Sequence, residues 1–200
     1  MYTPKHFAIS DAEEINSFIA KNSFGQLIAI ADGKPVSTPM PFLHNAEEGI
    51  LLGHVAKANP HWKQLEGHEV LVSLLGPHGY ISPSWYQSSG TPTWNYQTVH
   101  LYGTAHCFSD TEKLKQLVDT LTDFNEKSFE SPWQPEYEES KLQGIVGIEI
   151  ELSDIQCKFK LSQNRNLSEQ ENVCEHLKSS GANDLASVMD EAMQKVIKKD

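Results

Sequence analysis

A succession of short apolar and alternating segments between residues 24 and 76 most constrains the fold of this chain. The run Leu27–Ala31 is followed by Asp32-Gly33, a dipeptide that favours the tight turn of a β-hairpin. Residues 36–42 then alternate between apolar and polar side chains, and their two prolines suit an edge strand or a bulge. Apolar runs at 50–55 and 70–75 predict two further strands. This part of the chain is therefore expected to form a β-sheet.

Helices are predicted before and after these strands. Capping boxes at Ser10–Glu13, Ser109–Glu112 and Ser168–Glu171 each predict the start of a helix, and an apolar stripe of helical spacing follows the first two. A last helix is expected over 185–196, and further strands over 99–107, 145–150 and 155–161. About seven strands with interspersed helices predict an α+β fold, mainly β, in the form of a barrel with peripheral helices.

Residues 76–98 combine glycine, proline and serine with many aromatic side chains. The glycines and prolines interrupt a strand ladder, so the segment is not expected to be a regular core strand throughout. Exposed rings without a purpose are costly, and these rings would suit a flat heterocyclic ligand. Packing of the same rings on the barrel or on a partner subunit explains them equally well.

The segment from His54 to Trp62 is the best local candidate for an anion site. A strand ends, Lys57 follows, and Asn59-Pro60 is expected to cap a short helix over 61–65. A helix start offers free amides and a partial positive charge, and the lysine adds a full charge, which together suit a phosphate. The alternative is an ordinary strand-to-helix turn with a solvated lysine.

The segment 158–165 ends the last predicted strand. Lys158 and Lys160 lie at alternate positions, hence on one face, and three good hydrogen-bonding side chains follow them. The segment could surround a polar ligand, or it could be a solvated edge strand and its turn.

Other kinds of site receive no support. His100 and His106 share a strand face but lie roughly 20 Å apart at about 3.4 Å per residue, so they do not ligate one metal ion. The sequence lacks zinc-binding clusters, the G-x-S-x-G elbow of serine hydrolases, and the glycine-rich loops that bind NAD or ATP.

Charge and cysteine usage limit the partners and the compartment. The chain has 16 basic and 27 acidic residues, which gives a net charge of −11. Because DNA phosphates repel an acidic protein, tight binding of this chain to duplex DNA without a partner is not expected. Three dispersed cysteines predict reduced thiols. The chain begins without a signal-peptide pattern and has no apolar run of roughly 18 residues. A cytoplasmic protein without a membrane partner or a metal is expected.

Four segments taken together resemble the PaiB-type FMN-binding negative transcriptional regulators. They are His54–Trp62, Tyr80–Tyr86, Pro92–Tyr96 and Lys160–Arg165, and the resemblance covers residues 1 to about 165. It implies a split β-barrel related to pyridoxamine-phosphate oxidases, which dimerises and holds FMN in clefts between subunits. Residues 1–165 would form this domain, and 166–200 a C-terminal helical appendage.

The resemblance also implies a set of cofactor-binding residues. Lys57 and Asn59 would lie near the flavin phosphate, with His54 lining the cleft. The isoalloxazine side and the closing segment would be lined by Tyr80, Ser82, Trp94 and Asn95, and by Lys160, Ser162, Gln163 and Asn164.

Two functions follow, a flavin-binding repressor or a flavin oxidoreductase that does not contact DNA directly. Direct reading of DNA by the last helix is disfavoured, because Asp184, Asp190 and Glu191 occupy it.

Overall fold

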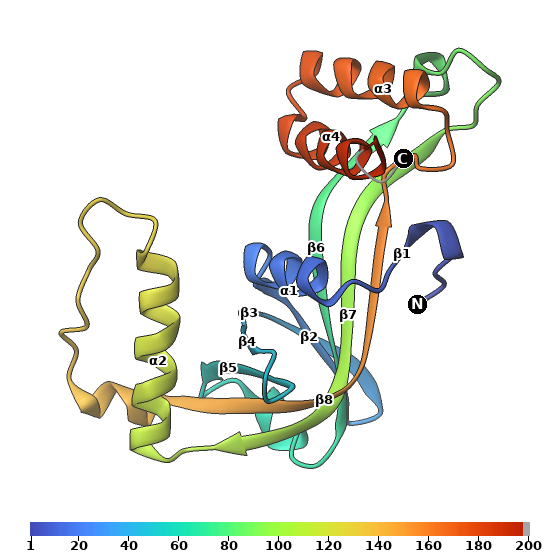
Figure 1. Cartoon of the computed structure of the whole chain (residues 1–200). Helices are drawn as coiled ribbons and strands as arrows, with labels where there is room; N and C mark the ends of the chain where they lie inside the picture. The colour runs from blue at the N-terminus through green and yellow to red at the C-terminus, as the bar shows by residue number, and fades with distance from the viewer. Residues whose placement is uncertain (198–200) are drawn as a thin grey trace. The chain divides into compact units, whose positions relative to one another are not determined.

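The computed structural model describes residues 1–197, which form two compact units. We call residues 1–15, 75–99 and 156–197 the terminal unit, and residues 16–74 and 100–155 the central unit. Three long strands contribute residues to both: β6 (Glu69–Ile81), β7 (Thr93–Phe108) and β8 (Ile145–Lys160) (Figure 1). The boundary predicted near residue 165 stays a prediction.

The strands are hydrogen-bonded in the order β3-β2-β6-β7-β8-β5-β4, and β1 (Ala8–Ile9) pairs with β8. The remaining bounds are Phe24–Ala31 for β2, Lys34–Pro41 for β3, Leu43–Asn45 for β4 and Ile50–Ala56 for β5. In the described part of the chain β3 and β4 end this order without pairing to each other, so the sheet is not closed. The mainly β, α+β fold is confirmed, with eight strands rather than about seven.

The β2–β3 hairpin forms as its turn residues predict. Asp32 and Gly33 have φ values of 51° and 72°, the left-handed conformations that this two-residue turn requires, and Ala31 pairs with Lys34. The prolines of β3 stand at odd positions (35, 39 and 41), where the backbone N–H faces away from β2. An edge strand tolerates them there, because no ladder hydrogen bond is lost.

The four α-helices are α1 (Ala12–Lys21), α2 (Thr111–Glu126), α3 (Leu167–Ser179) and α4 (Asn183–Ile197). The helices behind the three capping boxes are confirmed, but the predicted serine caps are wrong. Asp11, Asp110 and Asn166 accept the hydrogen bonds from the first-turn amides of α1, α2 and α3. Aspartate and asparagine cap at least as well as serine, and each lies within two residues of the predicted serine.

Two strand boundaries differ from the prediction. β6 continues to Ile81, so the irregular loop is limited to residues 82–92, which contain the short 3-10 helix η3 (Pro83–Trp85). The two strands predicted over 145–161 are one strand, β8. A neighbouring strand supplies backbone partners where the polar stretch at 151–154 interrupted the pattern, since Ile50 of β5 pairs with Glu151.

Each unit has its own apolar core. The central unit buries Leu27, Leu51, Val72, Leu101 and Ile148 from five strands, and Leu114, Leu117 and Leu121 from α2. In the terminal unit α3 packs against α4 (Figure 1), and the two helices bury Val173, Leu177, Leu185 and Met189. Further 3-10 helices are η1 (Lys5–Phe7), η2 (Pro60–Gln64) and η4 (Glu139–Gly144).

Candidate functional site

Lys57 follows β5 in the central unit and has an exposed side chain. Two hydrogen bonds fix its backbone: its N–H donates to the Gly144 carbonyl at 2.8 Å, and its carbonyl accepts from Trp62 Nε1 at 3.0 Å. Its main chain is therefore well positioned while its ammonium group remains accessible.

Asn59 caps the helix that follows, as predicted. Its Oδ1 accepts from the His61 N–H at 3.0 Å, and Pro60 is at the first position. The helix is only the five-residue 3-10 turn η2, so it has little of the dipole of a full helix, and one of its first amides is already satisfied. The predicted contribution of a helix start to anion binding is therefore small, and Lys57 is the principal positive charge of this segment.

Three histidines of the central unit, His54, His61 and His100, have a buried ring nitrogen without a partner among the described residues, and the first two belong to the segment that contains Lys57. His54 Nδ1 and His61 Nε2 have no hydrogen-bond partner in residues 1–197. His61 is buried, and its Nδ1 lies 2.8 Å from Thr38 Oγ1 on β3. Burial lowers the pKa of both imidazoles, so both rings are neutral near pH 7 and can donate or accept a hydrogen bond. Sequence analysis did not select His61, because a histidine inside a short helix has no distinguishing pattern.

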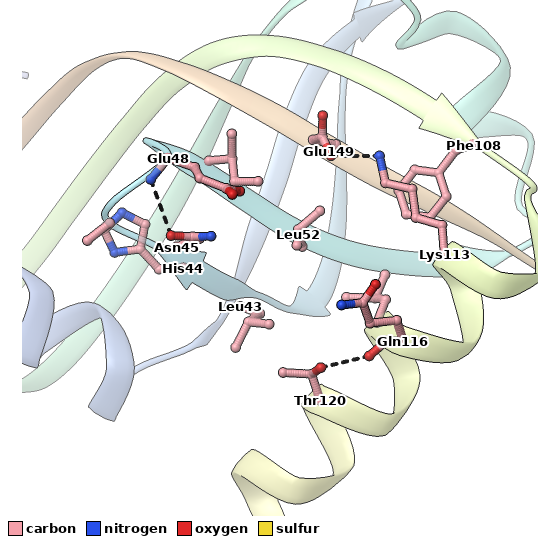
Figure 2. A pocket seen from close by; sticks show the side chains of 13 residues that line it. Leu43, His44, Asn45, Glu48, Leu52, Phe108, Lys113, Gln116, Thr120 and Glu149 are labelled. Carbon is pink, nitrogen blue, oxygen red and sulfur yellow. Dashed lines mark hydrogen bonds and ion pairs between the residues drawn. The ribbon is translucent and has the colours of Figure 1, made fainter.

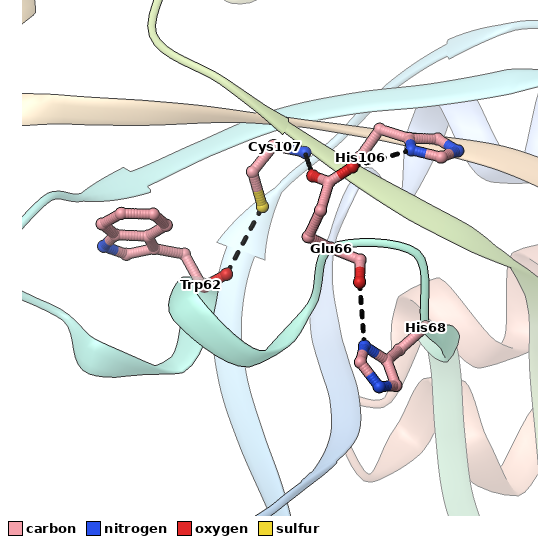
Figure 3. A network of polar contacts seen from close by, with 5 residues as sticks. All are labelled: Trp62, Glu66, His68, His106 and Cys107. Carbon is pink, nitrogen blue, oxygen red and sulfur yellow. Dashed lines mark hydrogen bonds and ion pairs between the residues drawn. The ribbon is translucent and has the colours of Figure 1, made fainter.

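Glu66, just beyond η2, fastens this segment to β7 (Figure 3). Its carboxylate accepts from the Cys107 N–H at 2.7 Å and lies 3.2 Å from His106 Nδ1. Cys107 Sγ donates to the Trp62 carbonyl at 3.4 Å, and burial with the nearby Glu66 charge raises the pKa of this thiol to about 11. The network holds Trp62, and through it the carbonyl of Lys57, against the strand.

In the terminal unit, Asn95 and Ser162 form a buried polar pair. Asn95 Nδ2 donates to Ser162 Oγ at 2.9 Å and also approaches Met189 Sδ at 3.3 Å. Asn95 Oδ1 is buried without a partner among the described residues. Ser162 adopts φ of 65°, and its hydroxyl lies 3.5 Å from Tyr86 Oη. These two predicted residues are brought together, in a fully buried position.

Lys160 is half-buried in the same unit. Its Nζ donates to Thr93 Oγ1 at 2.6 Å and to the Trp94 carbonyl at 2.7 Å. Desolvation, with the neighbouring Lys158 charge, lowers the pKa of this ammonium group. Lys160 therefore fixes the start of β7, which presents the Trp94 ring.

Tyr80 and Trp94 form an exposed aromatic pair at the ends of β6 and β7. Their ring centroids lie 6.1 Å apart in an edge-to-face arrangement, and the side chains are 46% and 55% exposed. An aromatic pair of this exposure offers a surface for a flat ring.

Gln163, Asn164 and Ser82 were also predicted to bind the cofactor. In the structure Gln163 closes its own turn, accepting from the Leu161 N–H and donating to the Phe159 carbonyl. Asn164 is exposed on that turn, and Ser82 Oγ accepts from the Ser84 N–H to cap η3.

The start of α3, together with the turn before it, holds the aromatic loop 82–92. Glu169 accepts from the Ser88 N–H and hydroxyl at 3.0 and 2.6 Å, and Arg165 stacks on Tyr86 with 4.2 Å from its guanidinium carbon to the ring centroid. Asn172 Nδ2 donates to the Trp85 carbonyl, and the Trp85 and His176 rings stack at 5.1 Å. Sequence analysis left this role of the C-terminal helices unassigned.

The predicted site residues thus fall into two groups. His54, Lys57 and Asn59 belong to the central unit, and the other eight belong to the terminal unit. In the described residues no helix is both long and apolar enough to cross a bilayer.

Comparison with known proteins matches residues 1–154 to the family described as "Putative FMN-binding domain". The protein "Protease synthase and sporulation protein PAI 2" of Bacillus subtilis is 41% identical over 98% of this chain and 100% of its own length. An uncharacterized protein of Emericella nidulans is 30% identical over 72% of this chain and 76% of its own.

Two solved structures share the fold at low sequence identity. The flavocytochrome Anf3 of Azotobacter vinelandii has a TM-score of 0.65 at 15% identity, covering 85% of this chain and 78% of that one. An FAD- and heme-binding protein of Mycobacterium smegmatis has the same TM-score at 17% identity, covering 82% and 78%.

Proposed function

Because this chain belongs to the FMN-binding domain family and has the split-barrel fold, we propose that it is a flavin-dependent regulator that holds FMN in a cleft between two copies of itself. The observation that carries the proposal is the combination of Lys57 with the unsatisfied nitrogens of His54 and His61 in one compact unit. The name of the Bacillus subtilis relative, which refers to protease synthase and sporulation, supports a regulatory role.

The residues fit FMN chemically. Lys57 is an accessible cation for a phosphate, in a protein whose net charge is −11. The buried nitrogens of His54 and His61 gain from a ligand that brings hydrogen-bonding atoms, since an unsatisfied buried polar group costs about 1–3 kcal/mol. Tyr80 and Trp94 supply exposed ring surface. When bound, FMN supplies electron transfer, and the protein supplies binding and orientation.

Exposed apolar side chains support a homodimer. Phe24 and Ile30 lie on one face of β2 and are 64% and 63% exposed. Large exposed apolar side chains gathered on a sheet face are typical of a surface that a partner covers. Light scattering should give twice the 22.4 kDa of one chain.

Regulation through a partner protein is more consistent with the charges than direct reading of DNA. The first part of α4 carries Asp184, Asp190 and Glu191, and Asp190 pairs with Lys178 at 2.6 Å. If α4 were a recognition helix, these carboxylates would face the negatively charged DNA and be repelled by its phosphates. The free cysteines support a reducing compartment, and the cytoplasm is part of the same proposal.

The test is titration of FMN into the apoprotein with matched lysine variants. Lys57→Ala should weaken FMN binding about 10- to 100-fold, the value of a charge-assisted hydrogen bond of about 1.5–3 kcal/mol. Lys63→Ala, an exposed lysine on η2, removes the same charge from the same unit and should leave FMN affinity unchanged. Equal affinities for the two variants would contradict the phosphate assignment. Rapid NADPH-dependent reduction of the bound flavin would instead favour an oxidoreductase.

A further inference from the structure

A cavity lies within the central unit, between α2 and the strands β4, β5 and β8 (Figure 2). Its volume is about 660 Å³, in the range of sites for small organic ligands. None of the residues that line it was among the predicted flavin-binding residues. The cavity is therefore separate from the predicted flavin-binding residues, and a ligand bound in it would add to the proposed flavin function.

The lining of this cavity is part apolar and part polar. Leu43, Leu52 and Leu117 line it together with the ring of Phe108. The Phe108 ring packs directly onto the backbone of β8 at Gly147, where a Cβ atom would lie 2.2 Å from ring carbon Cζ. The absence of a side chain at Gly147 thus fixes the position of one wall, so that the cavity is formed before any ligand arrives.

The one lysine that lines the cavity is already neutralised. Lys113 Nζ lies 2.8 Å from Glu149 Oε2 and 4.4 Å from the centroid of the Phe108 ring. An anionic ligand would have to compete with Glu149 for this ammonium group. The cavity consequently disfavours phosphates and carboxylates, which distinguishes it from a flavin-phosphate site.

Glu48 adds an uncompensated negative charge at the rim. It forms no ion pair within residues 1–197, and Figure 2 shows it on the turn between β4 and β5. Asn45 Oδ1 accepts from the backbone N–H groups of Glu47 and Glu48, both at 3.2 Å, which makes the turn rigid. Burial lowers the pKa of His44, so this lining residue contributes no positive charge near pH 7.

From this arrangement we infer that the cavity between α2 and the β4–β5 hairpin binds a small organic amine, with its apolar body against Leu52, Leu117 and Phe108 and its ammonium group at Glu48. The two carboxylates of Glu48 and Glu149 and the ammonium group of Lys113 together give the cavity a net charge of −1, which complements a monovalent cation. The amide and hydroxyl of Gln116 and Thr120 stand on the α2 side of the opening and can accept further N–H groups (Figure 2).

The experiment is calorimetric titration of the purified, flavin-loaded protein with two probes of similar shape. Phenethylamine should bind, and 3-phenylpropanoate, which replaces the ammonium group with a carboxylate, should not. The visible spectrum of the flavin should stay constant during the titration. No binding of phenethylamine, equal binding of the two probes, or a flavin spectrum that follows the amine would each overturn the inference.

Matched variants locate the site. Glu48→Gln should weaken phenethylamine binding by about two- to fivefold, as expected for a solvent-exposed ion pair. Glu47→Gln removes the same charge from the neighbouring exposed position, which does not line the cavity, and should have no effect. Thr120→Trp places a large ring in the opening and should abolish binding without lowering the melting temperature. Equal losses in the two glutamine variants, or unchanged affinity in Thr120→Trp, would place the amine elsewhere.

Discussion

Gly147 offers a sharp test of how the central unit is packed. A Cβ atom added there would lie 2.2, 2.3 and 2.6 Å from three carbons of the Phe108 ring, whereas carbon atoms in contact normally lie about 3.5–4.0 Å apart. The ring cannot simply rotate away, because the close atoms spread over its edge and Lys113 lies over it. Gly147→Ala must therefore displace the ring or the strand.

Overpacking of this kind costs about 1–3 kcal/mol of unfolding free energy. For a chain of this length each kcal/mol shifts the melting temperature by about 2–4 °C, so a cost of about 2 kcal/mol corresponds to about 4–8 °C. Chemical denaturation and thermal melting followed by circular dichroism both measure the effect.

Gly144→Ala is the matched control, three residues earlier. A Cβ atom there meets nothing within 4 Å and the backbone has no positive φ, so the substitution should be neutral or stabilise by up to about 1 kcal/mol. In a Phe108→Ala background, Gly147→Ala should lose most of its cost. If Gly147→Ala and Gly144→Ala unfold at the same denaturant concentration, the close packing of Phe108 on β8 is refuted.

The remaining predictions concern other parts of the chain. Burial raises the pKa of the Cys107 thiol to about 11 and the pKa of the Cys157 and Cys174 thiols to about 12. At pH 8 the native protein should therefore react slowly with a thiol reagent, whereas the unfolded chain should react at all three thiols. Fast labelling of the native protein would contradict this prediction. Hydrogen bonds from Ser88 lower the pKa of Glu169. The stabilising effect of this carboxylate should therefore be complete above the ordinary glutamate pKa of about 4.3 and be lost as the pH falls through the lower pKa of the folded state. Glu169→Gln should increase proteolysis within residues 82–92 at pH 7, and an unchanged cleavage rate would argue against the role of Glu169 in holding this loop. Gly33→Ala should lower the unfolding free energy by about 1 kcal/mol, because φ is 72° at this position. Gly67 has a similar φ of 69° but lies outside a hairpin, so Gly67→Ala measures the cost of the left-handed backbone conformation without the effect of the hairpin turn.

The sequence by itself determined the local elements. Alternation and the Asp32-Gly33 turn predicted the β2–β3 hairpin, and capping boxes and apolar stripes predicted α1 to α4. These features depend on neighbours within a few residues, so pattern is sufficient. The pattern was insufficient to identify the cap residue, because a serine and an aspartate or asparagine lie within two residues of each other at the start of α1, α2 and α3, and both types can accept from the first-turn amides.

Tertiary structure decided the continuity of strands and the partners of side chains. β6 and β8 run through segments that read as breaks, because adjacent strands complete their backbone hydrogen bonds. The motifs selected Lys57 and Asn95, but they could not show that Asn95 is buried against Ser162, that Gln163 closes its own turn, or that His61 reaches Thr38. Such contacts join residues far apart in the chain, and only the packing of the folded units determines them.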